Sequence, residues 1–210
     1  ITYIEAEVSW LRSRCRRLEA ERQLRDAADH VDARTTVLGA TTSTASQEQA
    51  RRIPQLRSVE DTIRQEIDVR LAINRSVGPQ LGLDVLVEAH ELDQFERMIL
   101  LVTTIGALGS DYMDVMSPVT LGYAHTPTLE LVSVLLEQSL AERMRSRVAL
   151  LPSGKLLATG LISVHVGSIA DPAEIPGAGL AISAEGFSVV TGMPELMREC
   201  RPKRRNGCDA

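Results

Sequence analysis

The sequence predicts a mainly α-helical protein that ends in a small β-hairpin, and three features support this prediction. The segment 93–108, DQFERMILLVTTIGAL, is apolar almost all round, which is typical of a helix buried on every side. Residues 1–25 carry apolar residues at alternating spacings of three and four, as in an amphipathic helix. Beyond residue 148 the apolar period shortens to two, which indicates strands. The expected fold class is therefore a helical bundle with a terminal β-hairpin, preceded by an amphipathic coiled-coil-like helix.

The composition fits one globular domain with an appendage, or two small domains. The chain has 210 residues, of which 44% are hydrophobic and 24% are charged. Its net charge of −5 argues against general affinity for nucleic acid. The cysteines are scattered without a Cys-x-x-Cys pair, which favours free thiols in a reducing compartment. With neither a signal peptide nor a long apolar run, we expect a cytoplasmic protein that does not span a membrane.

The apolar seam of the first helix is the candidate partner-binding surface. The residues predicted to contact a partner are Ile4, Val8, Leu11 and Leu18. Such a narrow stripe needs a partner, which is either the rest of the same chain or a second protein, including a second copy. The pattern fails at Arg22 and Arg25, where apolar residues are due, and this favours packing within the chain. The charged remainder of the helix, with alternating Glu and Arg, is expected to be solvated.

Changes in composition divide the chain into four parts. These are the amphipathic helix 1–31, a flexible linker 32–54, a helical and winged-helix-like domain 55–195, and a basic tail 196–210. The linker is inferred from Thr, Ser and Ala without periodicity. Ser58 and Asp61 resemble a capping box, so the next helix is expected to begin there and to end before Gly78.

The core helix is expected to start at Asp93, with Glu96 completing a capping box. Arg97 is expected to pair with a neighbouring carboxylate such as Glu91 or Asp93. Short helices are predicted near 84–92 and 110–117.

The chain after the core helix should hold one more long helix and then the strands. Thr126 and Pro127 predict the start of a helix that runs to about Leu140. Strands are predicted near 160–166 and 180–183, followed by a brief helix at 184–191. Helices followed by two short strands are typical of a winged helix.

Catalytic and cofactor-binding motifs are missing from the sequence. The string SGK at 153–155 is no phosphate-binding loop, because the required Gly is Ala149 and the required Ser or Thr is Leu156. The string HE at 90–91 lacks its second His, which is Gln94. The four histidines show no metal-ligand spacing. We therefore predict no enzymatic activity, no cofactor and no metal site.

A winged helix can bind DNA through basic residues on its recognition helix. The candidate recognition helix is PTLELVSVLLEQSL, residues 127–140, which carries Glu130 and Glu137 but no Lys or Arg. This argues against DNA readout. The basic residues of the tail are expected to form a solvated terminus.

The string LGLDVLVEAHELDQFERMILLV resembles the N-terminal region of a class of bacterial AAA+ ATPases. This class includes ATPases encoded beside extracellular contractile injection systems, which are phage-tail-like. The matching residues are Leu81, Leu83, Leu86, Leu92, Phe95, Glu96, Arg97, Leu100 and Leu101. LLPSGKLLATGLISV and AEGFSVVTG, with Phe187, Thr191 and Gly192, also fit, so the resemblance covers roughly residues 55–195.

The resemblance implies an accessory domain that engages substrates or partners for an AAA+ motor. In such proteins the ATPase module follows this region, whereas the present chain ends at Ala210, so the family's nucleotide-binding residues are carried over to no position here. We therefore expect a non-catalytic protein-interaction domain with protein partners, or self-association through the first helix. The alternatives are a winged-helix DNA-binding regulator and a coiled-coil structural subunit of a larger assembly.

Overall fold

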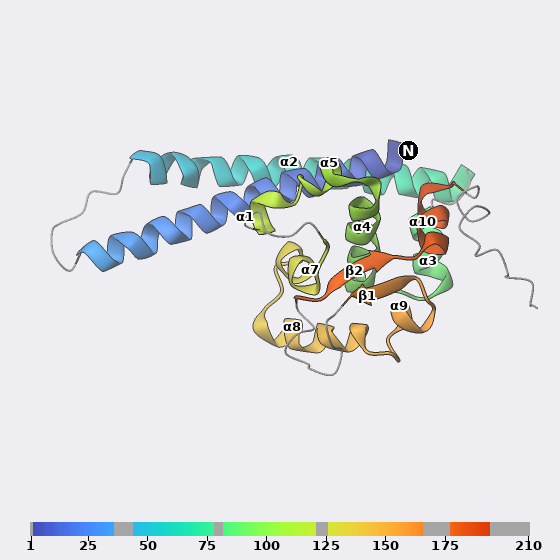
Figure 1. Ribbon diagram of the computed structural model, residues 1–210. Helices are drawn as coiled ribbons and strands as arrows, with labels where there is room; N and C mark the ends of the chain where they lie inside the picture. Colours follow the sequence, from blue (N-terminus) through green and yellow to red (C-terminus); the bar gives the residue numbers. More distant parts are fainter. Residues whose placement is uncertain (1, 36–43, 78–81, 121–125, 166–176, 194–210) are drawn as a thin grey trace, which may run out of the picture.

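The computed structural model describes residues 2–35, 44–77, 82–120, 126–165 and 177–193 (Figure 1). The described chain is mainly helical and contains one two-stranded antiparallel sheet. Two long helices lie along one side of the molecule, and the shorter helices and the sheet form a body on the other side. The predicted fold class is therefore confirmed.

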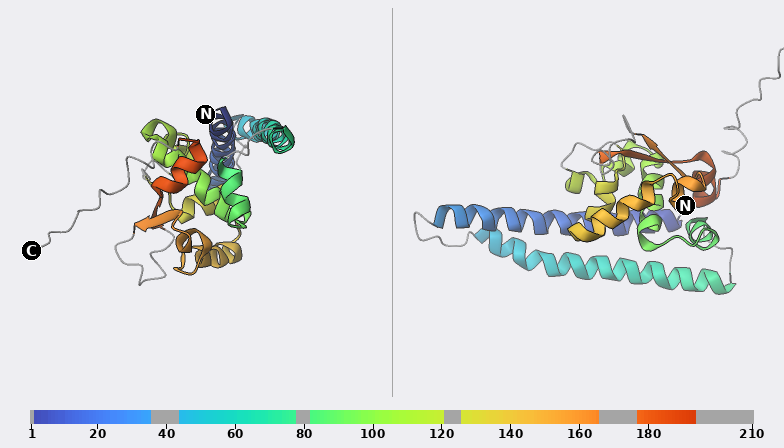
Figure 2. Two further views of the ribbon diagram at one scale, coloured as in Figure 1. Left: turned by 90° about the vertical axis from the view of Figure 1, so that its right-hand side faces the viewer. Right: turned by 90° about the horizontal axis from the view of Figure 1, so that it is seen from below.

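The two long helices form an antiparallel hairpin. They are α1 (Thr2–Thr35) and α2 (Thr44–Val77). Helix α1 lies between α2 and the body, and the end of the hairpin around residues 35 and 44 extends beyond the body (Figures 1 and 2). Because α1 has neighbours on two sides, it is buried over a much wider face than the narrow predicted seam.

The predicted linker over 32–54 is wrong for residues 32–35 and 44–54, which are helical. Gln, Glu, Ala and Arg in this part of α2 are good helix formers, and propensity together with pairing against α1 outweighs the missing periodicity. Residues 36–43 lie outside the described chain. Pro54 lies inside α2 on an exposed position, and Ser58 is an interior residue whose carbonyl accepts a hydrogen bond from the Thr62 hydroxyl, not an N-cap.

Helix α4 (Gln94–Leu108) is the centre of the body, as the sequence predicts. Asp93 caps it: its side chain accepts a bond from the Glu96 amide, while the Glu96 carboxylate accepts one from the Asp93 amide. Helix α4 contacts the sheet and four helices, which are α3 (Gly82–Ala89), α5 (Ser110–Met113), α7 (Leu129–Leu135) and α10 (Ala184–Thr191). Residues 98–105 are all buried. A helix apolar all round therefore does lie in the middle of the core.

The range 126–140, predicted as one helix, contains one short helix and the start of another. Both come after the short helix α6 (Ser117–Thr120). Helix α7 (Leu129–Leu135) is capped by Thr128, not Thr126. The chain then turns at Glu137, whose φ of 54° is left-handed, and a second helix begins. This helix is α8 (Leu140–Ser146), capped by Ser139, and it continues as the 3₁₀ helix η1 (Arg147–Leu150).

The strands lie where the sequence predicts them. Helix α9 (Lys155–Ala158) leads into β1 (Ile162–His165), which pairs with β2 (Gly179–Ile182) in the register Ile162 to Ile182. The chain just before α7 joins this sheet, because the Leu180 amide donates to the Pro127 carbonyl at 2.7 Å. Helix α10 (Ala184–Thr191) packs on α3, and the predicted basic tail 196–210 lies outside the described residues.

Candidate interaction surface

The predicted partner-binding residues all lie inside the protein. Ile4, Val8, Leu11 and Leu18 are buried, and they belong to one apolar core that also includes residues of α2, α4, α7 and the sheet. Of the two interpretations that the sequence left open, packing within the chain is the one that the structure shows. The seam holds the hairpin to the body and is not an exposed surface.

A buried carboxylate joins α1 to α4. Glu7 is fully buried, and its carboxylate accepts hydrogen bonds from Tyr3 Oη at 2.8 Å and from Arg97 Nη2 at 2.6 Å. Arg64 of α2 adds a third contact at 3.3 Å. The expected pairing of Arg97 with Glu91 or Asp93 is therefore wrong. Arg97 points toward α1, where the buried charge of Glu7 needs a counter-charge more than the exposed Glu91 and Asp93 do.

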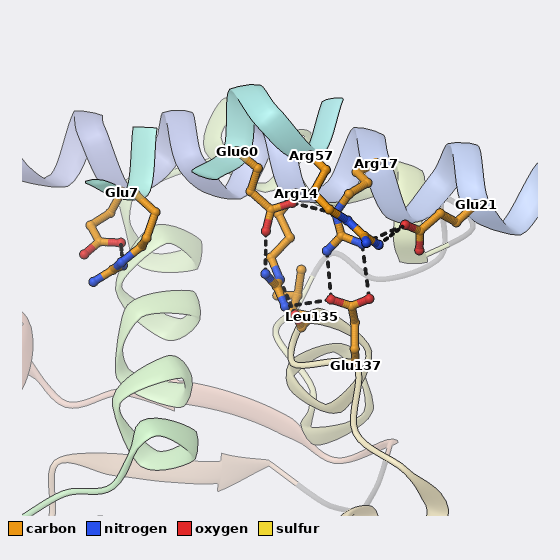
Figure 3. A network of polar contacts seen from close by, with 9 residues as sticks. Glu7, Arg14, Arg17, Glu21, Arg57, Glu60, Leu135 and Glu137 are labelled. Carbon is orange, nitrogen blue, oxygen red and sulfur yellow. Dashed lines mark hydrogen bonds and ion pairs between the residues drawn. The ribbon is translucent and has the colours of Figure 1, made fainter. Parts of the chain in front are cut away.

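A larger network of charged residues joins α1, α2 and the turn between α7 and α8 (Figure 3). The guanidinium of Arg17 bonds Glu60 of α2 at 2.6 Å and Glu137 at 2.8 and 3.1 Å. Arg14 bonds the same two carboxylates and also donates to the backbone carbonyl of Leu135, the last residue of α7. These contacts fix the turn that orients α8.

The ionisation behaviour of this network follows from its geometry. Hydrogen bonds from Arg17, opposed by partial burial, leave the pKa of Glu137 below its usual value. Burial alone would lower the pKa of Arg17, but its bonds to Glu137, Glu60 and Glu21 raise it instead. Both groups are therefore charged at neutral pH, and the turn is held by ion pairs.

The face of α8 and η1 that points away from the core is apolar. Leu140, Met144 and Val148 are 78%, 53% and 59% exposed, and Leu151, just after η1, is 40% exposed. Their spacing of four, four and three residues places them on one side of the helix. Only Leu150 of α8 and η1 is buried. We call the four exposed residues the α8 stripe.

Basic side chains flank the α8 stripe. Residues 139–155 contain Arg143, Arg145, Arg147 and Lys155 against the single acid Glu142, a net charge of +3 in a chain whose total is −5. Arg143 Nε bonds the Gln138 carbonyl, and Lys155 Nζ bonds the Glu91 carbonyl, so both have fixed directions. The stripe therefore lies in a segment of the chain whose net charge is positive.

A groove of about 410 Å³ runs along one side of the α8 stripe. Arg145 and Val148 line it from α8 and η1, and Ser153, Gly154 and Lys155 line it from the start of α9. The N-terminal end of α4 closes the far side. One edge of the stripe is thus a concave surface that holds two cations, Arg145 and Lys155, and three acids, Asp93, Glu96 and Glu142.

The order of these elements defines the class of protein. Helices α7 and α8 form a helix-turn-helix, the antiparallel strands β1 and β2 follow, and the Thr128–Gly179 bridge ties the start of α7 to β2. This arrangement is a winged-helix domain. The family described as "winged helix domain, variant" matches residues 1–203, and the chain belongs to it. No curated protein and no solved structure matches the chain.

Within the ranges given above, no three or more His, Cys, Asp or Glu side chains gather in a way that would hold a metal ion. In the same ranges, no helix combines the length and the apolar character needed to cross a bilayer.

The structure divides the candidate recognition helix that was predicted at 127–140. From the sequence alone, α7 and the turn after it look like one amphipathic helix. In the structure α7 is the first helix of the helix-turn-helix, with Leu129, Leu131 and Leu135 buried, and α8 is the second. The signal that could have located α8 is the capping box of Ser139 and Glu142.

Proposed function

We propose that this winged-helix domain is a non-catalytic protein-interaction domain that engages partners or substrates for an AAA+ ATPase-like motor. The α8 stripe is the partner contact. The single observation that supports this assignment is the exposure of Leu140, Met144 and Val148 on the second helix of the helix-turn-helix. A cytoplasmic location belongs to the same proposal.

The chemistry of the stripe favours a protein over DNA. A helix that enters the major groove meets hydrogen-bonding base edges and phosphates, and uses polar and basic side chains there. Three large apolar side chains on that face would meet mainly polar groups. Against an apolar protein surface, each would instead contribute about 25 cal/mol per Å² of area removed from water.

The AAA+ part of the proposal rests on the resemblance of residues 55–195. Of the residues that carry it, Leu83, Leu86, Phe95 and Leu100 are buried in the body. These residues form part of the buried core of the body, and α8 lies on the surface of that body. Self-association through the first helix would require its apolar seam to leave the core, so we move the proposed partner contact from that seam to the α8 stripe.

DNA binding is the second candidate, because one observation favours it. The second helix carries Arg143, Arg145 and Arg147, which the helix chosen from sequence alone did not. Basic residues at this place in a helix-turn-helix are those that would contact phosphates.

A binding titration separates the two candidates. A labelled mixed-sequence duplex of about 30 base pairs is titrated with the protein at about 50 and 200 mM salt, with fluorescence anisotropy as the readout. We expect no saturable binding at the higher salt concentration. Sub-micromolar binding with a steep salt dependence, lost in Arg145→Glu, would overturn the interaction proposal in favour of the DNA-binding regulator.

The AAA+ part has its own test, which is the reading frame that encodes these residues. We expect it, or an adjacent frame, to encode a phosphate-binding loop of the form Gly-x₄-Gly-Lys-Ser/Thr. If no such module is encoded nearby, the AAA+ part falls and the interaction part stands.

A further inference from the structure

We propose that the α8 stripe binds an acidic amphipathic helix of a partner protein, laid along α8 and η1. This inference rests on the proposed function and adds the chemistry of the partner. It draws on three features of one surface: the length of the stripe, the charge around it and the groove beside it.

The length of the stripe fits one short helix. From Leu140 to Leu151 the chain advances about 19 Å, at 1.5 Å per residue along α8 and about 2.0 Å per residue from η1 onward. A partner helix of roughly three to four turns covers this length, and apolar residues at i, i+4, i+7 and i+11 would present four apolar side chains to the four residues of the stripe. The four apolar residues of the stripe do not pack into the core of their own chain, since Leu140, for example, is 78% exposed.

The charge around the stripe selects an acidic partner. Arg143 and Arg147 lie on one side of the stripe by helical periodicity, and Arg145 lies on the other. A partner helix with Glu or Asp on both sides of its apolar stripe would meet a cation on each side. A basic partner would meet repulsion on both sides, and like-charge contacts reduce association strongly.

The groove lies on the Arg145 side of the stripe. It contains Lys155, whose ammonium is held by the Glu91 carbonyl, and also the carboxylates of Asp93, Glu96 and Glu142. Acidic side chains on that side of the partner helix would pair with Arg145 and Lys155. Those on the Arg143 side would meet a solvated edge of the body.

The α2 helix supplies a matched control surface. Val69 and Ile73 are each 56% exposed on its outer face, close to the 53% and 59% of Met144 and Val148. Residues 59–73 of α2 contain the acids Glu60, Asp61, Glu66 and Asp68 against Arg64 and Arg70, a net charge of −2, opposite in sign to the α8 region. An acidic helix should therefore bind at α8 and not at α2.

The test uses the full chain and three synthetic peptides of about 18 residues. The first has Leu at i, i+4, i+7 and i+11 with Glu flanking on both sides. The second replaces each Glu with Lys, and the third is acidic with its leucines scrambled. Binding of labelled peptide is followed by fluorescence anisotropy, with circular dichroism confirming that each protein variant folds.

We expect saturable binding of the acidic amphipathic peptide, at least about tenfold tighter than that of either control peptide. Val148→Asp should weaken it at least about tenfold, and Ile73→Asp should leave it unchanged. Arg145→Glu should weaken the acidic peptide and strengthen the lysine peptide. Because Val148 and Arg145 are exposed, these variants are expected to fold normally.

Several results would overturn the inference. These are equal binding of the scrambled peptide, preference for the lysine peptide, no binding to any peptide, or insensitivity to Val148→Asp. Binding to vesicles of phosphatidylcholine and phosphatidylglycerol, lost in Val148→Asp while no peptide binds, would assign the face to a lipid surface. If the peptide experiment fails and the protein also does not bind duplex DNA, only the acidic-helix inference is overturned. If the protein binds duplex DNA and Arg145→Glu abolishes that binding, the proposed function is overturned as well.

Discussion

The carboxylate of Glu137 and the guanidinium of Arg17 meet side by side, with Nη1 to Oε1 at 3.1 Å and Nη2 to Oε2 at 2.8 Å. One residue lies in α1 and the other in the turn before α8, 120 positions further along the chain. Two parallel bonds fix direction as well as distance. The helical hairpin therefore holds the turn from which α8 begins, and with it the direction of the α8 stripe.

Replacement of Arg17 tests how much this network stabilises the fold. In Arg17→Met the buried carboxylate of Glu60 keeps only Arg14 as its counter-charge. Breaking a buried ion pair from one side costs about 3 kcal/mol of unfolding free energy. Urea denaturation with an unchanged m-value measures this loss. The exposed neighbour variant Arg16→Met should change stability by less than about 0.5 kcal/mol, and a similar small change for Arg17→Met would show that the network adds nothing.

The pH dependence of Glu137 provides a second test, with Glu137→Asn as the variant. Asn tolerates the left-handed φ of 54°, so the substitution removes the charge without adding backbone strain. Because the pKa of Glu137 is lowered in the folded state, its stabilisation is complete above its usual value of 4.5 and is lost as the pH falls through the lowered pKa.

We therefore expect the wild type to exceed Glu137→Asn by about 1 kcal/mol at neutral pH, a small value because the carboxylate is partly exposed. This difference in unfolding free energy should shrink below pH 4.5. A difference that grows as the pH falls would contradict the assignment. Denaturant titrations at a series of pH values provide the measurement.

The Glu7–Arg97 contact should show strong coupling in a double-mutant cycle. The variants are Glu7→Gln, Arg97→Met and their combination. A 2.6 Å contact to a fully buried carboxylate predicts a coupling free energy of at least about 1 kcal/mol. The exposed pair Arg75 and Glu88, 3.8 Å apart, is the matched control and should couple by less than about 0.5 kcal/mol. Equal coupling in both pairs would mean that burial of Glu7 does not strengthen its interaction.

The capping box of α4 is tested by Asp93→Ala. The Glu96 amide then loses its acceptor, and the central helix loses about 1 kcal/mol. Thermal or urea unfolding detects this change. The next residue, Gln94, is exposed, so Gln94→Ala should be neutral within about 0.5 kcal/mol. A neutral Asp93→Ala would show that water replaces the cap without loss.

The parts of the fold that follow from local patterns were predictable from the sequence. The core helix, its cap at Asp93 and the two strands are examples, because periodicity and capping chemistry are properties of neighbouring residues. The helical start of α2 was missed because its stability comes from pairing with α1, including the Gln49–Gln23 bond at 2.6 Å, and from helix formers that show no period.

The α8 stripe was not predicted from the sequence, because it too depends on contacts between residues that are far apart along the chain. The division of 127–140 into α7 and a turn depends on Glu137, whose carboxylate is held by two arginines of α1. A contact over so many positions has no signal in the local sequence. Once the turn is misplaced, residues 140–151 look like a charged connection, and their apolar residues go unnoticed although they share one side of a helix.

Hydrogen–deuterium exchange of the full chain, with and without the acidic amphipathic peptide, tests the central claim most directly. The amides of α8 and η1 belong to a short, exposed helical segment. A partner bound on the α8 stripe should therefore slow their hydrogen exchange. We predict peptide-dependent protection over residues 140–151, with no change over 59–73 of α2. Protection confined to α2, or a peptide that binds without protecting 140–151, would contradict the assignment of this face as the partner contact.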